Sequence, residues 1–133
     1  MKFMLMMNAP RGTGDYQINQ WPPEALKAHM QFMQDLNRDL AKNGELVDIQ
    51  ALTPPGQAQI VRHGQGGTAV VTDGPFAETK EFLAGYWIID VESPERAHEI
   101  AARASSAPGP DGKPLIIPIE VRRVMDCLAH SEG

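Results

Sequence analysis

The order of the apolar segments is the feature that most constrains the fold. A short apolar run, Phe3–Met7, precedes a long segment from Pro22 or Pro23 to Asn43-Gly44 in which apolar residues recur at steps of three and four. This spacing predicts an amphipathic helix with one buried stripe. The stripe comprises Leu26, Met30, Met33, Leu36 and Leu40. Proline in the first turn and glycine after the last turn fit its two ends.

Strand-forming runs and a second helix follow. We expect strands over residues 46–52, 59–63, 68–72, 82–91 and 115–121. Ser93-Pro94-Glu95 predicts a helix start, because it offers an N-cap hydroxyl, a first-turn proline and an acid near the positive end of the helix dipole. The order strand, helix, several strands, helix, strand predicts an α+β fold of the ferredoxin-like kind, an antiparallel sheet with both helices on one face.

Composition narrows the class of protein. The 133 residues predict a single domain, 1–133. A net charge of −5 without a basic stripe argues against nucleic-acid binding. No apolar run reaches the roughly 20 residues of a membrane span, and no signal-peptide pattern opens the chain, so we expect a cytoplasmic protein that binds no membrane. Cys127 is the single cysteine, which excludes an intramolecular disulfide.

Two of the expected strands are too apolar for a sheet with one solvated face. Phe3–Met7 and Tyr86–Ile89 are apolar at nearly every position, whereas a sheet covered on one face should alternate polar and apolar residues. Something must therefore cover the second face. Closed two-fold homodimers are the commonest oligomers. The sequence predicts a homodimer whose sheets pack together.

The segment Asp73-Gly74-Pro75-Phe76 follows a β-branched run and contains an unusual turn. An Asp-Gly pair in this position normally forms a tight hairpin turn with positive φ at both residues. Pro75 disfavours that conformation at Gly74, because a proline pushes the preceding residue towards extended backbone. We therefore expect Asp73 to be held at the end of a strand.

The same region carries a family resemblance. The block Val71–Glu81, followed by Ala84-Gly85-Tyr86-Trp87, resembles the hallmark segment of YCII-related proteins of the DGPF type. Similar segments at 1–5, 52–55 and 119–122 extend the resemblance over most of the chain. It implies a ferredoxin-like fold assembled as a dimeric α+β barrel. It also implies an association with sigma factors of the extracytoplasmic-function type, because members are often encoded beside them.

Asp73 is the first candidate for chemistry. An acid at a strand end can serve as a general base if it is partly desolvated. The alternative is that its carboxylate accepts backbone hydrogen bonds and fixes the turn. Gly74 and Pro75 set the conformation beside it, and Phe76 is either a core residue or a stacking surface for a ligand.

Glu78, Lys80 and Glu81 form a charged run after this turn. In an extended segment Glu78 and Lys80 point to the same side and can pair, and Lys80 can bind an anionic ligand. The alternative is that these charges are simply solvated, since exposed ion pairs contribute only about 0–1 kcal/mol.

His29 lies on or beside the buried stripe of the first helix. A first-helix histidine paired with an acid is a suggested active-site dyad of YCII-related proteins, and His29 stands in a similar place. The alternative is a half-buried histidine hydrogen-bonded within the core. The other histidines and Cys127 show no metal-ligand spacing, so we expect neither a metal nor a cofactor.

Two functional hypotheses follow. The first is an enzyme or small-molecule-binding dimer with a pocket between the first helix and residues 73–81, in which Asp73 and His29 act as acid and base. Lys80 anchors an anionic ligand there, beside Glu78, Phe76, Gly74 and Pro75. The second is a regulatory module that binds another protein, such as a sigma factor.

Overall fold

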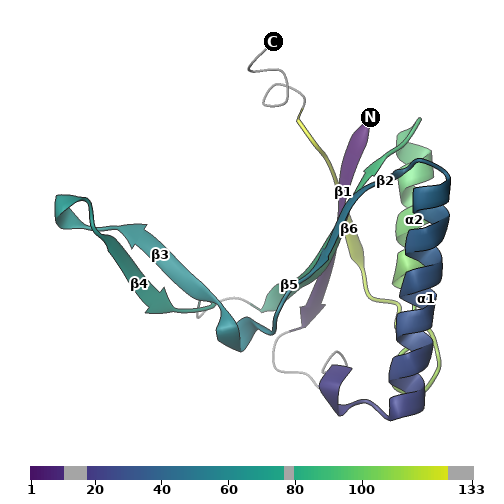
Figure 1. Ribbon diagram of the computed structural model, residues 1–133, viewed down its shortest axis with the longest axis horizontal. Helices are drawn as coiled ribbons and strands as arrows, with labels where there is room; N and C mark the ends of the chain where they lie inside the picture. The colour runs from purple at the N-terminus through teal and green to yellow at the C-terminus, as the bar shows by residue number, and fades with distance from the viewer. Residues whose placement is uncertain (11–17, 77–79, 126–133) are drawn as a thin grey trace.

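The fold is an antiparallel sheet with two helices on one face and a separate hairpin on the other side (Figure 1). A computed structural model describes residues 1–10, 18–76 and 80–125. The main sheet contains β1 (Lys2–Pro10), β2 (Leu46–Ala51), β5 (Glu81–Asp90) and β6 (Ile119–Arg123). The helices are α1 (Pro23–Lys42) and α2 (Pro94–Ser105), and the hairpin contains β3 (Gln59–His63) and β4 (Ala69–Asp73).

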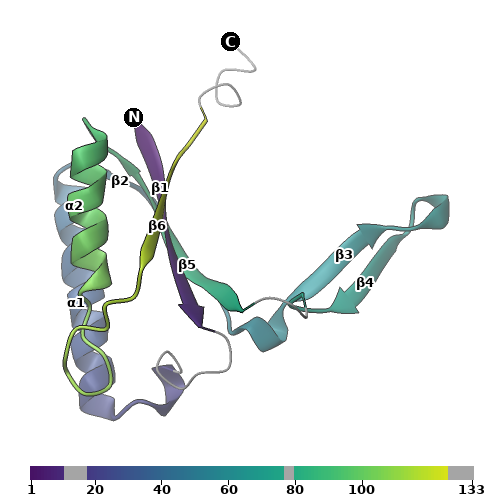
Figure 2. The ribbon, with the colours of Figure 1, turned by 180° about the vertical axis from the view of Figure 1, so that it is seen from behind.

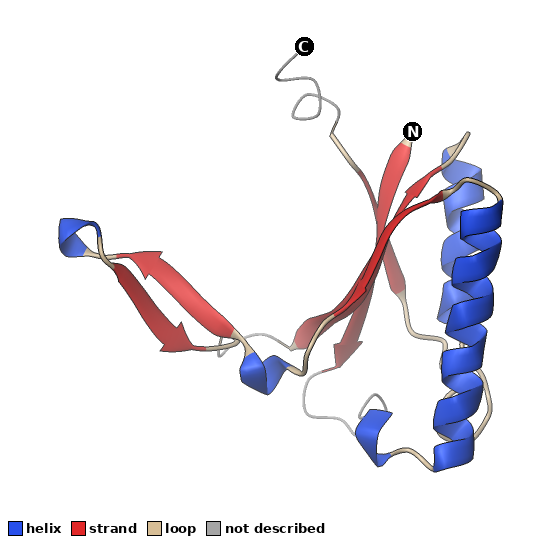
Figure 3. Cartoon of the chain, viewed as in Figure 1, coloured by secondary structure: helices blue, strands red, loops and turns tan. Residues whose placement is uncertain are grey.

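The strand order confirms the predicted ferredoxin-like α+β fold. The sheet runs β2-β5-β1-β6, and each neighbouring pair is antiparallel. Both helices pack on the same face (Figure 3). Within the described residues, neither helix combines the length and apolar character that crossing a membrane requires.

The core lies between the sheet and the helices. Along β1 fully buried residues alternate with half-buried ones, so that Leu5 and Met7 face the helices whereas Met4 and Met6 face away. Trp87 is buried on the inner face of β5, where its Nε1–H donates a hydrogen bond of 2.9 Å to Oδ1 of Asn37 on α1. The helix residues of the core are Leu36, Leu40, Ala97, Ile100, Ala101 and Ala104. The expected burial of Met30 is wrong: Met30 is exposed, because its neighbour His29 takes the buried position at this turn of α1.

The second helix begins as its sequence predicts. Oγ of Ser93 accepts a hydrogen bond of 3.2 Å from the backbone N–H of Arg96. The Arg96 guanidinium donates two hydrogen bonds of 2.8 Å to the Glu45 carboxylate, which lies just before β2. These bonds lower the pKa of Glu45 and anchor the start of α2 to the sheet.

The last strand begins later than the sequence predicts. Residues 115–118 pass beside the end of α2. There the Ser105 hydroxyl donates a hydrogen bond of 2.7 Å to the carbonyl oxygen of Ile117, and the N–H of Leu115 donates one of 2.9 Å to the carbonyl oxygen of Ala107. Ile116 has a φ of 54°, which is incompatible with a strand. Pairing with β1 therefore starts at Ile119. At the other end of the chain, β1 continues to Pro10, further than expected.

Gly85 allows β2 to approach β5 closely. A Cβ at this position would lie 2.9 Å from the carbonyl oxygen of Gln50 on β2. Because that neighbour is backbone, a side chain at position 85 would push the two strands apart. This packing constraint accounts for a glycine in an otherwise strand-forming run.

The outer face of the main sheet is not covered by another described element. We call it the open face, defined at its centre by Met4, Met6, Tyr86 and Ile88. All four side chains are half-buried. The Tyr86 hydroxyl donates a hydrogen bond of 3.2 Å to Asp48, and partial burial together with the Asp48 charge raises the pKa of Tyr86.

Candidate functional site

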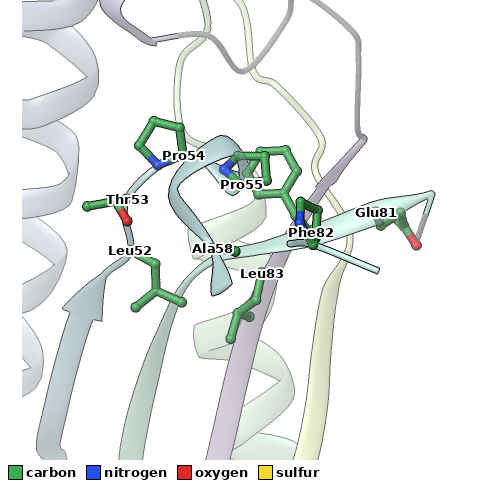
Figure 4. A pocket seen from close by; sticks show the side chains of 9 residues that line it. Leu52, Thr53, Pro54, Pro55, Ala58, Glu81, Phe82 and Leu83 are labelled. Atoms are coloured by element: carbon green, nitrogen blue, oxygen red, sulfur yellow. The ribbon is translucent and has the colours of Figure 1, made fainter. Parts of the chain in front are cut away.

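A groove lies where the chain leaves β2 and where β5 begins (Figure 4). Its volume is about 400 Å³. One wall is the turn after β2 and the other is the first part of β5. The lining residues are Leu52, Thr53, Pro54, Pro55, Ala58, Pro75, Glu81, Phe82 and Leu83.

Prolines and backbone hydrogen bonds give the groove its shape. Pro54 and Pro55 lead into a short 3₁₀ turn, Pro55–Gln57, which closes with a hydrogen bond of 3.0 Å from the N–H of Ala58 to Pro55. The N–H of Leu52 donates a hydrogen bond of 2.8 Å to the carbonyl oxygen of Ala84, so β2 and β5 remain joined at this end. The groove therefore has walls fixed by backbone geometry.

The groove is apolar with one acidic side chain. Leu52, Phe82 and Leu83 supply apolar side chains, and three prolines supply rigid rings. Among its described lining residues, Glu81 is the ionisable one, and it lies exposed at one end of the groove (Figure 4). Such a site can enclose an apolar group while a carboxylate oxygen accepts a hydrogen bond or pairs with a cation.

Pro75 brings the Asp73-Gly74-Pro75-Phe76 segment to the edge of the groove. The backbone N–H of Gly74 donates a hydrogen bond of 2.8 Å to the carbonyl of Ala58, which ties this segment to the groove wall. Asp73 ends β4 opposite Gln59 and is exposed. Phe76 is also exposed and does not line the groove.

Two other predicted ligand-binding residues, Glu78 and Lys80, come shortly before β5 in the sequence. Lys80 is exposed immediately before the strand and does not line the groove, whereas its neighbour Glu81 does. Glu78 lies outside the described residues. Within the described ranges, His, Cys, Asp and Glu side chains form no group of three that could hold a metal ion.

His29 lies in a different part of the molecule. His29 is 2% exposed. Its ring packs edge-to-face against the ring of Trp21 with 5.1 Å between the ring centroids, and its Nδ1 lies 2.9 Å from the carbonyl oxygen of Pro108. Because a carbonyl only accepts hydrogen bonds, Nδ1 carries the proton. His29 belongs to α1, and the sheet separates α1 from the β3–β4 hairpin that ends at Asp73 (Figure 1). One chain therefore does not bring His29 and Asp73 together.

Most lining residues of the groove carry no chemical signal in the sequence. Leu52 is the last residue of a predicted strand, residues 53–55 follow that strand, and Glu81 belongs to a charged run. The groove exists because β5 pairs with β2 across a gap of some thirty residues in sequence. The two consecutive prolines after an apolar run are the one signal that indicates a rigid wall.

Comparisons with known proteins agree with the resemblance in the sequence. The model of the YCII-related domain family matches residues 1–108. An uncharacterised protein of Rhizobium meliloti (strain 1021) is 37% identical over 87 residues, which cover 65% of this chain and 69% of that relative.

Proposed function

This chain belongs to the family of proteins with a YCII-related domain, and we propose that it binds a small, largely apolar molecule in the groove between residues 52–55 and the start of β5. The observation that carries the proposal is the groove itself. Its volume of about 400 Å³ falls within the range of small-molecule sites, roughly 300–1,000 Å³. The rigid walls favour binding because little ordering is needed when the ligand enters.

The lining residues indicate the chemistry of the ligand. Leu52, Phe82 and Leu83 would enclose an apolar group, and Glu81 would accept a hydrogen bond from a hydroxyl or pair with an amine. An anionic ligand, which Lys80 suggests in the sequence, would be repelled by Glu81. We therefore propose a neutral or cationic ligand with an apolar body.

Carboxylates would be the groups that exchange a proton with a bound molecule. Glu81 lines the groove, and Asp73 lies two residues from the lining residue Pro75. A general base must lie within hydrogen-bond reach of the proton it removes, and because both acids are exposed, the bound molecule itself would have to desolvate the carboxylate that acts. In this proposal His29 supports the fold of α1 and the loop that contains Pro108.

The proposed form of the protein is a homodimer that packs through the open face. Cross-strand neighbours make one row of Asp48, Ile88, Met4 and Arg122, with an acid at one edge of the sheet and a base at the other. A two-fold axis parallel to the strands would place Asp48 of each copy over the partner subunit's Arg122. The apolar residues at the centre of the row would meet each other.

Replacing Glu81 by glutamine should remove a preference for cationic ligands. We expect the wild-type protein to bind hexylamine more tightly than hexanoate, by up to about fivefold, because an exposed ion pair contributes about 0.2–1 kcal/mol. Isothermal titration with hexylamine, hexanol and hexanoate measures this preference. In Glu81→Gln the three dissociation constants should become similar.

Glu92→Gln is the matched control for charge, since Glu92 is exposed beyond the opposite end of β5. It should keep the wild-type order of affinities. An unchanged preference for the amine in Glu81→Gln, or no binding of any probe at millimolar concentration, would contradict the proposed site.

A further inference from the structure

The β3–β4 hairpin, residues 59–73, stands away from the rest of the domain, and we call it the arm (Figures 1 and 2). In the part of the chain that the structure describes, its strands pair only with each other. Every residue of β4 is exposed, and in β3 only Ile60 is half-buried. An isolated two-stranded hairpin is marginally stable in water. The arm therefore needs a surface to pack against.

One face of the arm is suited to an apolar contact. Val61 and Val71 lie directly opposite each other and are 62% and 52% exposed. Because side chains alternate along a strand, they share a face with Ala69 and His63 towards the tip and with Asp73 at the base. Two neighbouring valines exposed on a strand pair are a typical contact surface for another protein.

The base of the arm joins the turn that follows β2. The hydrogen bond from the N–H of Gly74 to Ala58 continues the pairing of β3 with β4, and the N–H of Ala58 donates a hydrogen bond of 3.0 Å to Pro55 in that turn. The arm leaves the domain on the side opposite the helices, which is the side of the open face (Figures 1 and 2). The arm and the open face meet at an angle. A second molecule that covers the open face would therefore also lie beside the arm.

We propose that the arm packs, through Val61 and Val71, on a second copy of this chain that occupies this angle. The inference rests on the homodimer of the proposed function and identifies a second segment of its interface. The Asp48 and Arg122 edges of the open face complement each other across a two-fold axis, which favours another copy over an unrelated protein. Because of that symmetry, the arm of each copy would pack on the other copy.

A double variant tests the arm without destroying it. Val61→Lys with Val71→Glu removes the apolar contact surface but leaves an opposite-charge pair across the two strands, which supports the hairpin itself. We expect the dimer dissociation constant, measured by analytical ultracentrifugation, to rise at least tenfold. Met30→Lys, an exposed apolar position on α1 across the sheet, is the control and should leave the constant unchanged.

A second variant removes most of the arm, and it tests the contact even if the two introduced charges do not weaken the dimer. Ile60 and Thr72 lie opposite each other, two residues along the ladder from the hydrogen-bonded pair Ala58 and Gly74, so an Asn-Gly turn can replace residues 61–71. It should weaken the dimer at least as much as the double variant does. A dimer constant unchanged in both variants overturns the arm contact and leaves the homodimer standing. A wild-type protein that is monomeric at 100 μM, about the upper end of assay concentrations, overturns both.

Discussion

Ile88→Lys is expected to convert the proposed dimer into a folded monomer. Ile88 lies at the centre of the open face, between Asp48 and Met4 on the neighbouring strands. In the monomer the lysine can pair with Asp48, whereas in the dimer it would be buried against a second copy. Burying a charge without a full partner costs about 3 kcal/mol or more. The dimer dissociation constant should therefore rise at least about 100-fold, as measured by sedimentation equilibrium.

Ile89→Lys is the control that separates assembly from folding. Ile89 is the next residue, but it points to the helices and is 0% exposed. A lysine there should abolish the folded circular-dichroism spectrum, because an unpaired charge would enter the core. If Ile88→Lys left the dimer intact, or unfolded the chain as Ile89→Lys does, the proposed interface would be wrong.

His29→Ala is expected to destabilise the fold by about 3 kcal/mol. The substitution removes the ring that packs on Trp21, leaves the Pro108 carbonyl without its side-chain donor and creates a cavity. Urea unfolding monitored by circular dichroism measures the loss as a lower midpoint with an unchanged slope. The folded fraction should bind hexylamine with wild-type affinity, because the described residues that line the groove include none from α1.

Met30→Ala is the neighbouring control for helix α1. Met30 is 47% exposed, so its truncation should change the free energy of unfolding by less than about 0.5 kcal/mol. The opposite pattern for His29→Ala, unchanged stability with lost probe binding, would restore His29 as a binding residue and contradict its assignment to the core.

The fold could be predicted from local patterns because each pattern has a single structural meaning. The steps of three and four from Leu26 to Leu40 define one helix, and the Ser93-Pro94 cap defines the start of the other. Phe3–Met7 and Tyr86–Ile89, the two runs that are apolar at nearly every position, lie in β1 and β5, the central strands of the sheet. What covers the open face of that sheet stays a prediction.

The groove could not be predicted because it depends on contacts between distant segments. The charged run after Pro75 predicts Lys80 as a ligand-binding residue, yet the start of strand β5 brings Glu81 to the groove. Asp73 and His29 appeared compatible as a pair, since a sequence does not reveal on which side of the sheet each element packs. Only the register of β2 with β5 brings residues 52–55 beside Phe82 and Leu83.

Methyl-resolved NMR shows directly whether the groove beside Pro75 binds a ligand. Hexylamine is titrated into protein labelled at the methyl groups of leucine and alanine. If hexylamine binds in the groove, concentration-dependent shifts are expected at the methyl groups of Leu52, Ala58 and Leu83, with the core methyls of Leu36 and Leu40 unchanged. Shifts confined to the helix side of the sheet, with those three groove methyls unmoved, would contradict it.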